Sequence, residues 1–115
     1  MNANKSQEIS YRIFKMLADN PNQSQRQMAA KMSISLGKFN YCLTKLLKKG
    51  FVKMERFTAS HNKAAYMYIL TPQGIEEKVR VTAAFLQYKQ EEFAEIKKQI
   101  EELAIEVKAA ERTSS

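Results

Sequence analysis

The chain has 115 residues, 44% of them apolar, and a formal net charge of +7 at pH 7. That is material for one folded domain with an appended helix. The chain has no apolar run of about 18 residues that could span a membrane and no apolar signal segment near its start, so we expect a cytoplasmic protein.

The first predicted helix covers residues 8–18, and residues 1–5 are expected to be a flexible terminus. After it, Ser24 and Gln27 form an S-x-x-Q capping box, in which each side chain satisfies a free backbone N–H at a helix start. This pattern predicts a short helix over Gln25–Met32.

A second capped helix follows almost at once. Ser35 is a suitable N-cap, Lys48-Lys49 complements the carbonyl end of the helix, and Gly50 can adopt the left-handed conformation that ends it. The apolar stripe that faces a core consists of Leu36, Phe39, Cys42, Leu43, Leu46 and Leu47. Two helices separated by so few residues must cross, which is the helix-turn-helix arrangement. We expect Cys42, the single cysteine, to be a small buried apolar residue.

The opposite face of this second helix is polar and basic, as expected of a helix that enters a DNA major groove. The side chains expected to contact DNA from this helix and its N-cap are Ser35, Gly37, Lys38, Asn40, Tyr41, Thr44, Lys45 and Lys48. Asn40 can both donate and accept, and so could read adenine, whereas Lys45 and Lys48 fit phosphate. Gln25 and Arg26, at the start of the preceding helix, are expected to face phosphate as well.

Two strands are predicted next, at residues 51–57 and 66–70, because apolar and polar residues alternate with an aromatic and β-branched bias. Residues 58–65 between them are expected to form a basic loop, so that the pair makes a wing. The wing residues expected to reach the DNA backbone or the minor groove are Arg56, His61, Asn62 and Lys63. Asn62 and Lys63 fit a hairpin turn equally well. Tyr66 and Tyr68 are expected to pack against the second helix, and His61 has no companion ligands for a metal.

Thr71 and Pro72 start a long helix without a breaker until about Arg112. Its apolar positions alternate spacings of four and three over about five heptads, interrupted by Thr82 and Lys89. We expect residues 6–74 to form the winged domain, 75–111 a coiled-coil helix, and 112–115 a flexible end.

The seam of this helix is expected to bury itself against a second copy of the chain. The residues assigned to this dimer interface are Leu86, Lys89, Phe93, Ile96, Ile100, Leu103 and Val107. The first two turns, with Ile75 and Val79, are expected to fold back on the domain instead. Glu92 would meet Lys97 of a parallel partner, but one favourable pair leaves the orientation and a higher oligomer open.

The charge distribution indicates the kind of partner. Residues 1–80 contain 14 Lys and Arg against 5 Asp and Glu, while residues 81–115 contain 5 against 7. The basic surface therefore belongs to the winged part, where double-stranded DNA would bind. The chain has only three glycines, too few for a glycine-rich phosphate loop, and no nucleophile with a partner histidine, so we do not expect an enzyme. No set of residues indicates a cofactor. Two alternatives remain, namely a protein-interaction module, which Leu36 at the helix start keeps open, and a DNA-architectural protein without sequence preference.

Three segments together carry a family resemblance. They are Ser35 to Leu43 (SLGKFNYCL), Lys49 to Lys53 (KGFVK) and Asn62 to Lys78 (NKAAYMYILTPQGIEEK). They resemble the MarR-type regulators found beside exopolysaccharide biosynthesis genes in bacteria, over roughly residues 8 to 100. The resemblance implies a dimeric transcription factor, and the link to polysaccharide genes comes from the resemblance alone. In most MarR proteins helices at both ends interlock, often around a small-molecule pocket. Here little chain precedes the first helix, so the C-terminal helix is expected to dimerise alone and no effector is identified.

Overall fold

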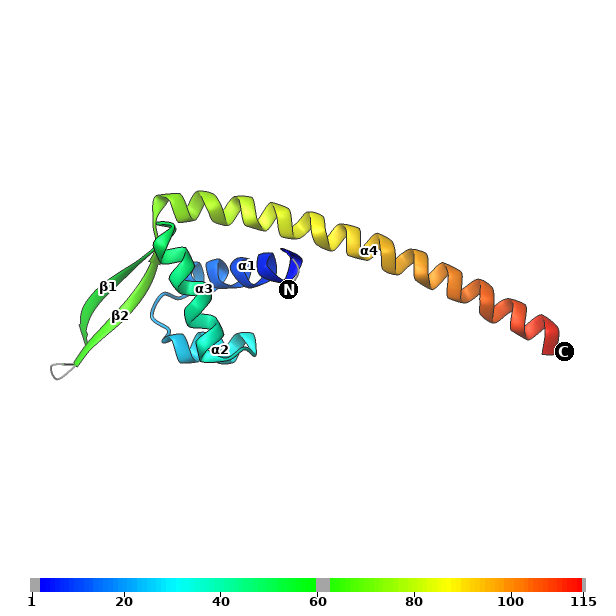
Figure 1. The fold of residues 1–115 in the computed structure, drawn as a ribbon, viewed down its shortest axis with the longest axis horizontal. Coiled ribbons are helices and arrows are strands. Elements are labelled where there is room, and N and C mark those ends of the chain that lie inside the picture. Colours follow the sequence, from blue (N-terminus) through cyan, green and yellow to red (C-terminus); the bar gives the residue numbers. More distant parts are fainter. Residues whose placement is uncertain (1–2, 60–62, 115) are drawn as a thin grey trace.

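A computed structural model describes the backbone of residues 3–59 and 63–114, and the side chains of residues 5–56 and 66–114. The elements in chain order are α1 (Ala3–Asp19), α2 (Gln25–Met32), α3 (Leu36–Lys48), β1 (Val52–Ala59), β2 (Lys63–Leu70) and α4 (Pro72–Ser114). Helices α1 to α3 gather beside a two-stranded hairpin, and α4 runs over α1 and far beyond it (Figure 1). The predicted fold class, a winged helix-turn-helix with a long C-terminal helix, is confirmed.

One hydrophobic core joins the three N-terminal helices. Helix α1 places Ile13 and Phe14 at its centre, where they are almost fully buried with Met28 of α2 and with Phe39 and Leu43 of α3. Helix α1 runs from Ala3 to Asp19, so it extends beyond the predicted 8–18 at both ends, and residues 3–5 are helical. The apolar stripe of each helix faces the others, which fixes how α2 and α3 cross.

Local capping interactions set the helix ends. The capping box at Ser24 is present in full, with the Ser24 side chain accepting from the Gln27 N–H and the Gln27 side chain accepting from the Ser24 N–H. Ser35 caps α3 by accepting from the Lys38 N–H at 3.0 Å. Gly50, at a φ of +79°, follows the C-cap Lys49 in the left-handed region, as predicted. Helix α2 therefore has its predicted bounds, and α3 ends at Lys48 with Lys49 as its C-cap.

The hairpin is longer than the sequence pattern indicated. Strands β1 and β2 pair antiparallel from Val52 opposite Leu70 to Ala59 opposite Lys63, so most of the predicted loop 58–65 is strand. With no Gly or Pro in that stretch, nothing in the chain stops the ladder earlier. Phe51 lies outside β1 because its N–H donates to Leu46 and its carbonyl oxygen accepts from Thr71.

The start of α4 is fixed against the end of α3. The Thr71 hydroxyl accepts from the Gly74 N–H at 3.0 Å and donates to the Gly50 carbonyl oxygen at 2.5 Å. Gly74 lies so close to the chain that a Cβ there would be 1.9 Å from the Phe51 carbonyl oxygen. This contact determines which face of α4 turns toward the domain.

The face of α4 that packs on the domain differs from the one predicted. Val81 is buried, and the Phe85 ring stacks on Tyr11 of α1 with 5.0 Å between ring centres. Ile75 and Val79, which were expected to fold back, are 57% and 68% exposed. That expectation was wrong because the Gly74 contact brings the neighbouring helix face onto α1, about 100° around the helix from Ile75.

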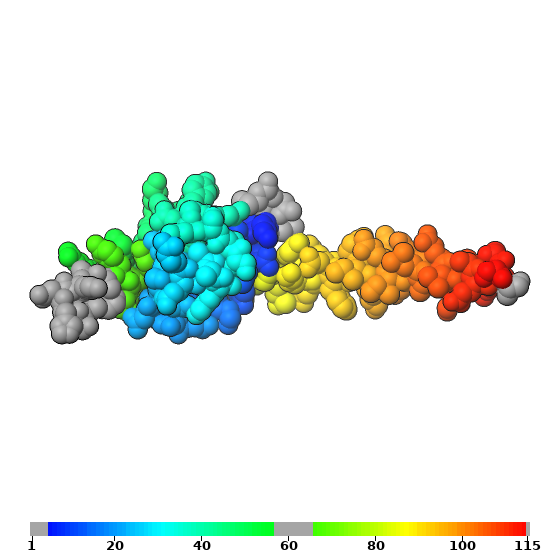
Figure 2. Space-filling model, turned by 90° about the horizontal axis from the view of Figure 1, so that it is seen from below, coloured from blue at the N-terminus to red at the C-terminus, as the bar shows by residue number. Residues whose placement is uncertain are grey.

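Beyond this contact α4 leaves the domain. Every described position from Phe93 to Ser114 is exposed, and Figure 2 shows this part as a rod with no other segment over the visible face. The molecule measures 77 × 28 × 23 Å as a result. Residues 112–114, expected to be flexible, continue the helix. Among the described residues, no helix is long and apolar enough to cross a membrane.

Candidate nucleic-acid interface

Helix α3 is anchored by one side and open on the other. Phe39, Leu43 and Leu46 are buried in the core, whereas Gly37 and Asn40 lie on the exposed side. The structure places the other predicted contacts of α3 around the same open side, with Tyr41, Lys45 and Lys48 exposed and Lys38 and Thr44 half-buried. Ser35 lies at its N-terminus as the cap. The predicted residues of α3 are thus spread over its open side and both of its flanks.

One flank of that surface is a corner between α2 and α3. Gln25 and Arg26 of α2 line an open depression together with Leu36, Gly37 and Asn40 of α3. A Cβ added at Gly37 would meet no atom within 4 Å, so the backbone here is open to a partner. The N-terminus of α2 begins at this corner, and a helix N-terminus favours an anion.

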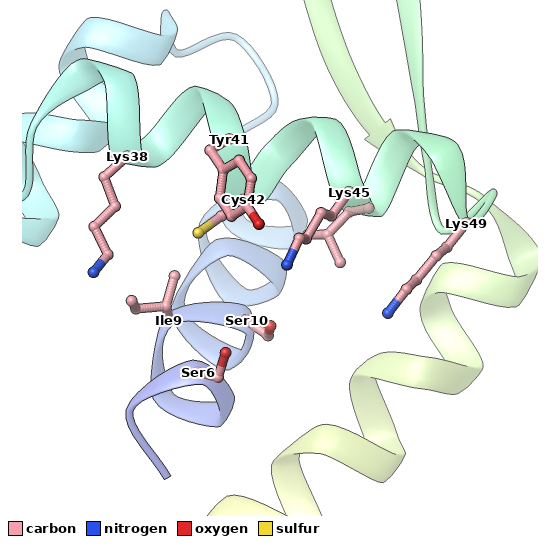
Figure 3. A pocket seen from close by; sticks show the side chains of 9 residues that line it. Ser6, Ile9, Ser10, Lys38, Tyr41, Cys42, Lys45 and Lys49 are labelled. Atoms are coloured by element: carbon pink, nitrogen blue, oxygen red, sulfur yellow. The ribbon is translucent and has the colours of Figure 1, made fainter. Parts of the chain in front are cut away.

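The other flank carries a cluster of lysines. Lys38 and Lys45 of α3 and its C-cap Lys49 project toward the first turns of α1, where Ser6 and Ser10 complete a pocket (Figure 3). Their ammonium groups create a positive surface that fits phosphate or another anion.

Three of the pocket residues were missed by the sequence analysis. Lys49 lies four residues after Lys45, so helical spacing alone could have placed it on this stripe. Ser6 and Ser10 also lie four apart, but nothing local in the sequence shows that α1 faces α3.

Tyr41 positions Lys45 within this cluster. The Lys45 ammonium group lies 4.5 Å from the centre of the Tyr41 ring. Its side-chain hydrogen bond with Tyr41 is the main reason that the pKa of Lys45 is raised above the ordinary value of 10.5. Lys45 is therefore fully protonated at neutral pH. Cys42, on the same helix, is half-buried and packs against the core, with one side lining the pocket.

The wing lies on the β1–β2 hairpin. Arg56 is exposed on β1, directly across from Tyr66 of β2. Lys63 is the first residue of β2, and His61 and Asn62 lie outside the described residues.

The two tyrosines of β2 differ in burial. Tyr68 belongs to the core at 8% exposed, but Tyr66 is 49% exposed, so the expectation that both tyrosines pack against the second helix was wrong for Tyr66. The hairpin extends past the core, and Tyr66 lies on the part beyond it.

A second surface belongs to α4. The predicted interface residues lie in one line along the rod, and Leu86, Phe93 and Ile100 are 58%, 68% and 60% exposed. Ile96, Leu103 and Val107 are exposed by similar fractions. Lys89, the charged member of the line, is ion-paired with Glu92 of its own helix at 3.1 Å and lies over the rings of Phe85 and Tyr88. Its charge is thus turned toward the flank of the apolar line.

Comparison with known proteins agrees with this fold. Residues 6–53 match a family model described as winged helix-turn-helix DNA-binding. Among solved structures, a MarR family transcription regulator is similar at a TM-score of 0.53 and 24% identity, over 76% of this chain and 56% of that one. The PcaV transcriptional regulator from Streptomyces coelicolor is similar at a TM-score of 0.55 and 16% identity, over 84% of this chain and 77% of that one. The same regulator in complex with its natural ligand is similar at 0.51 and 16%, over 83% and 74%.

No curated protein sequence matches this chain significantly. The chain spans little more than half the length of the first of these regulators, and at these identities the likeness concerns the fold.

Proposed function

We propose that this chain is a sequence-specific, double-stranded DNA-binding transcriptional regulator that acts as a homodimer. The observation that carries the proposal is the open side of α3, where Asn40 lies beside the start of α2 and Lys38 and Lys45 lie on the opposite flank. The match of residues 6–53 to a DNA-binding model supports it.

In the proposed complex α3 enters the major groove. Asn40 and Gly37 face the base edges, while Lys45 and Lys48 neutralise phosphates on either side. Gln25 and Arg26 at the start of α2 meet a backbone phosphate, and Arg56 on the wing, with His61, Asn62 and Lys63 at its tip, approaches the neighbouring strand. Phosphate contacts supply most of the affinity and base contacts supply the sequence preference.

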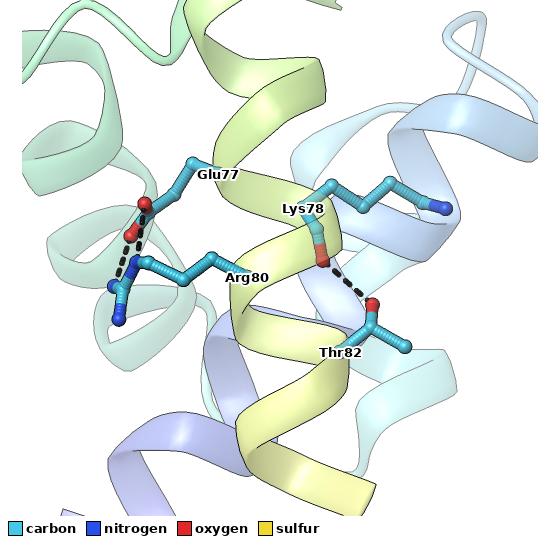
Figure 4. A network of polar contacts seen from close by, with 4 residues as sticks. All are labelled: Glu77, Lys78, Arg80 and Thr82. Carbon is cyan, nitrogen blue, oxygen red and sulfur yellow. Dashed lines mark hydrogen bonds and ion pairs between the residues drawn. The ribbon is translucent and has the colours of Figure 1, made fainter.

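The dimer forms through the apolar line of α4. A helix of 43 residues is roughly 65 Å long, and its second half has no part of its own domain to cover it. The two polar positions of the apolar repeat, Thr82 and Lys89, are compatible with burial. The Thr82 hydroxyl donates to the Lys78 carbonyl oxygen at 2.7 Å, as Figure 4 shows, and so turns its methyl group outward. The Lys89 charge is paired within its own chain.

A two-fold dimer would read a palindromic site whose half-sites lie about one helical turn apart. The control of exopolysaccharide biosynthesis genes is the finer part of this proposal, and it rests on the motif resemblance alone. An operator recovered from binding experiments would test it, because the site should then occur beside such genes.

The deciding experiment is selection of bound sequences from a random duplex pool at about 150 mM salt, where non-specific phosphate attraction is weakened. A symmetric enriched motif is expected. Retention without enrichment would contradict sequence-specific reading and favour an architectural role, and no retention would favour a protein-interaction module.

A double variant, Lys38→Ala with Asn40→Ala, should lose the motif without loss of far-UV circular dichroism. Lys98→Ala, which removes a positive charge from the exposed part of α4, is the control and should keep it. Unchanged selection by the double variant would remove α3 from the interface.

A further inference from the structure

The side chain of Gln25 joins two residues that lie far from it in the sequence. Its Nε2 group donates to the Tyr68 hydroxyl oxygen at 2.8 Å, and its Oε1 atom accepts from Nδ2 of Asn40 at 3.1 Å. The three residues belong to β2, α2 and α3. The chain of hydrogen bonds therefore runs from the core edge of the wing to the open side of α3.

The fixed end of this chain is Tyr68. Its ring is part of the core and is 8% exposed, so its hydroxyl oxygen stays in one place. Gln25 is half-buried beside it, and Asn40 is exposed. Burial thus decreases from Tyr68 through Gln25 to Asn40. Through its two hydrogen bonds, Gln25 connects the exposed Asn40 side chain to the buried Tyr68.

The polarity of the bonds determines which way the Asn40 amide faces. In the structure the Gln25 NH2 group donates to the Tyr68 hydroxyl oxygen, so the Gln25 Oε1 atom faces Asn40 and accepts one of its N–H groups. One N–H of Asn40 is thereby occupied. Its Oδ1 atom and its second N–H are left for a partner, and adenine offers the complementary N6 donor and N7 acceptor in the major groove.

We propose that Gln25 and Tyr68 are positioning residues that orient the Asn40 amide and thereby set a preference for adenine at one base pair of each half-site. This inference rests on the proposed function and adds two specificity determinants outside the helix that enters the groove. Neither Gln25 nor Tyr68 needs to touch that base.

The test uses the full chain and duplexes that differ at the position read by Asn40, which Asn40→Ala identifies. Tyr68→Phe keeps the ring in the core and removes only the hydroxyl group. We expect it to lower the preference for adenine at this position by about two- to twelvefold, the worth of one neutral hydrogen bond, with affinity for unrelated duplex unchanged. Tyr66→Phe removes an exposed hydroxyl from the same strand and should change nothing.

Gln25→Glu provides a rescue that a merely structural role would not show. A carboxylate accepts through both oxygens, so it still takes the Asn40 N–H and can take the Tyr68 O–H as well. We expect the adenine preference to persist in this variant, although the added negative charge lowers overall affinity. In the Gln25→Glu background, Tyr68→Phe should no longer alter the preference, because a carboxylate presents an acceptor oxygen to Asn40 in either orientation.

Two results would overturn the inference. One is an adenine preference that Tyr68→Phe leaves unchanged, and the other is an equal loss of affinity for every duplex, which would mean that the hydroxyl only supports the fold.

The free protein provides a readout that does not depend on DNA. The Asn40 and Gln25 side-chain amide signals in ¹⁵N nuclear magnetic resonance spectra should move in Tyr68→Phe and stay in Tyr66→Phe. If the amide signals respond as expected but the wild-type chain selects no sequence, the proposed function fails while the hydrogen-bond chain stands. If the amide signals do not respond, the positioning inference fails by itself.

Discussion

Lys45 illustrates how a single side chain on α3 is prepared for an anion. Its ammonium group is held against the Tyr41 ring and its pKa is raised, chiefly by the hydrogen bond with Tyr41. With a raised pKa, Lys45 is protonated at physiological pH and carries the positive charge that a phosphate would need. Asn40, on the same helix, carries no charge, and in the proposed complex it would act through the direction of its amide group.

Lys45→Ala should therefore weaken DNA binding without changing sequence preference. We expect affinity to fall by a similar factor for specific and unrelated duplexes, and the slope of log affinity against log salt to decrease by about 1. Titrations at several salt concentrations with both duplexes measure this. A changed base preference with an unchanged slope would show that Lys45 reads a base.

The Lys89–Glu92 pair predicts a pH dependence of α4. The Lys89 ammonium group, and after it the Tyr88 hydroxyl, lower the pKa of Glu92 below the ordinary 4.5. A carboxylate with a lowered pKa in the folded state stabilises that state above its unfolded pKa, and this contribution is lost as the pH falls through the folded value. Once the pH falls below the lowered pKa of Glu92, Lys89 is left without its partner beside the apolar line.

Association of the wild-type chain should therefore weaken on acidification more than that of Glu92→Gln, which has no carboxylate to protonate at this position. Sedimentation between pH 7 and pH 3 compares the two. Parallel curves for both chains would show that the pair does not influence the interface.

At the scale of elements, the decisive contact is the one between the first turn of α4 and the connection from α3 to β1. Thr71 links the two through its hydroxyl, and Gly74 brings the helix backbone against the Phe51 carbonyl oxygen. The face carrying Val81 and Phe85 is then the one that reaches α1. The apolar line is left outward along its whole length, which makes it available to another chain.

Gly74→Ala tests this contact. The new Cβ would collide with the main chain of Phe51, which cannot move as a flexible side chain could. We expect a loss of about 1–3 kcal/mol or more in the free energy of unfolding, measured by denaturant titration.

Gly37→Ala is the matched control, because that position opens into free space. There the change should be neutral or stabilise the chain by up to about 1 kcal/mol. Equal effects at the two glycines would show that the Gly74 contact does not hold α4.

At the scale of the whole molecule, the structure separates a basic domain from an extended helix 43 residues long. The domain contains a complete core, and the helix has an apolar line that its own domain does not cover. Two chains joined along this line would present two α3 helices to one duplex. Once one domain has bound its half-site, the second domain would bind the other half-site as an intramolecular step, without a further loss of translational freedom.

A double substitution on the line, Ile100→Glu with Leu103→Glu, should give a monomer, because each apolar side chain buried in the dimer contributes about 1.5–3 kcal/mol and the charges would face one another. Ile105→Glu with Ala109→Glu adds the same charge to exposed positions off the line and should leave the dimer intact. Sedimentation equilibrium distinguishes the two variants.

Affinity for a duplex with two half-sites should fall by at least about a hundredfold in the Ile100→Glu, Leu103→Glu variant. The Ile105→Glu, Ala109→Glu control should keep it. A surviving dimer would place the interface elsewhere.

The sequence by itself determined the parts that depend on near neighbours. The Ser24 and Gln27 capping box, the Ser35 and Thr71 caps and the left-handed Gly50 each involve residues within a few positions of one another, so local chemistry was sufficient. The repeat of apolar residues along α4 was visible for the same reason, because helical spacing is a property of the chain alone.

Only the tertiary structure decided what lies against what. Ile75 and Val79 have the same spacing as the rest of the line, and nothing local shows that Gly74 turns a different face of α4 onto α1. The pocket that Ser6 and Ser10 line with the lysines, and the hydrogen bonds from Tyr68 through Gln25 to Asn40, bring together residues that are distant in the chain. Such contacts depend on the angles at which packed helices and strands meet, and those angles are set by the shared core rather than by any one segment.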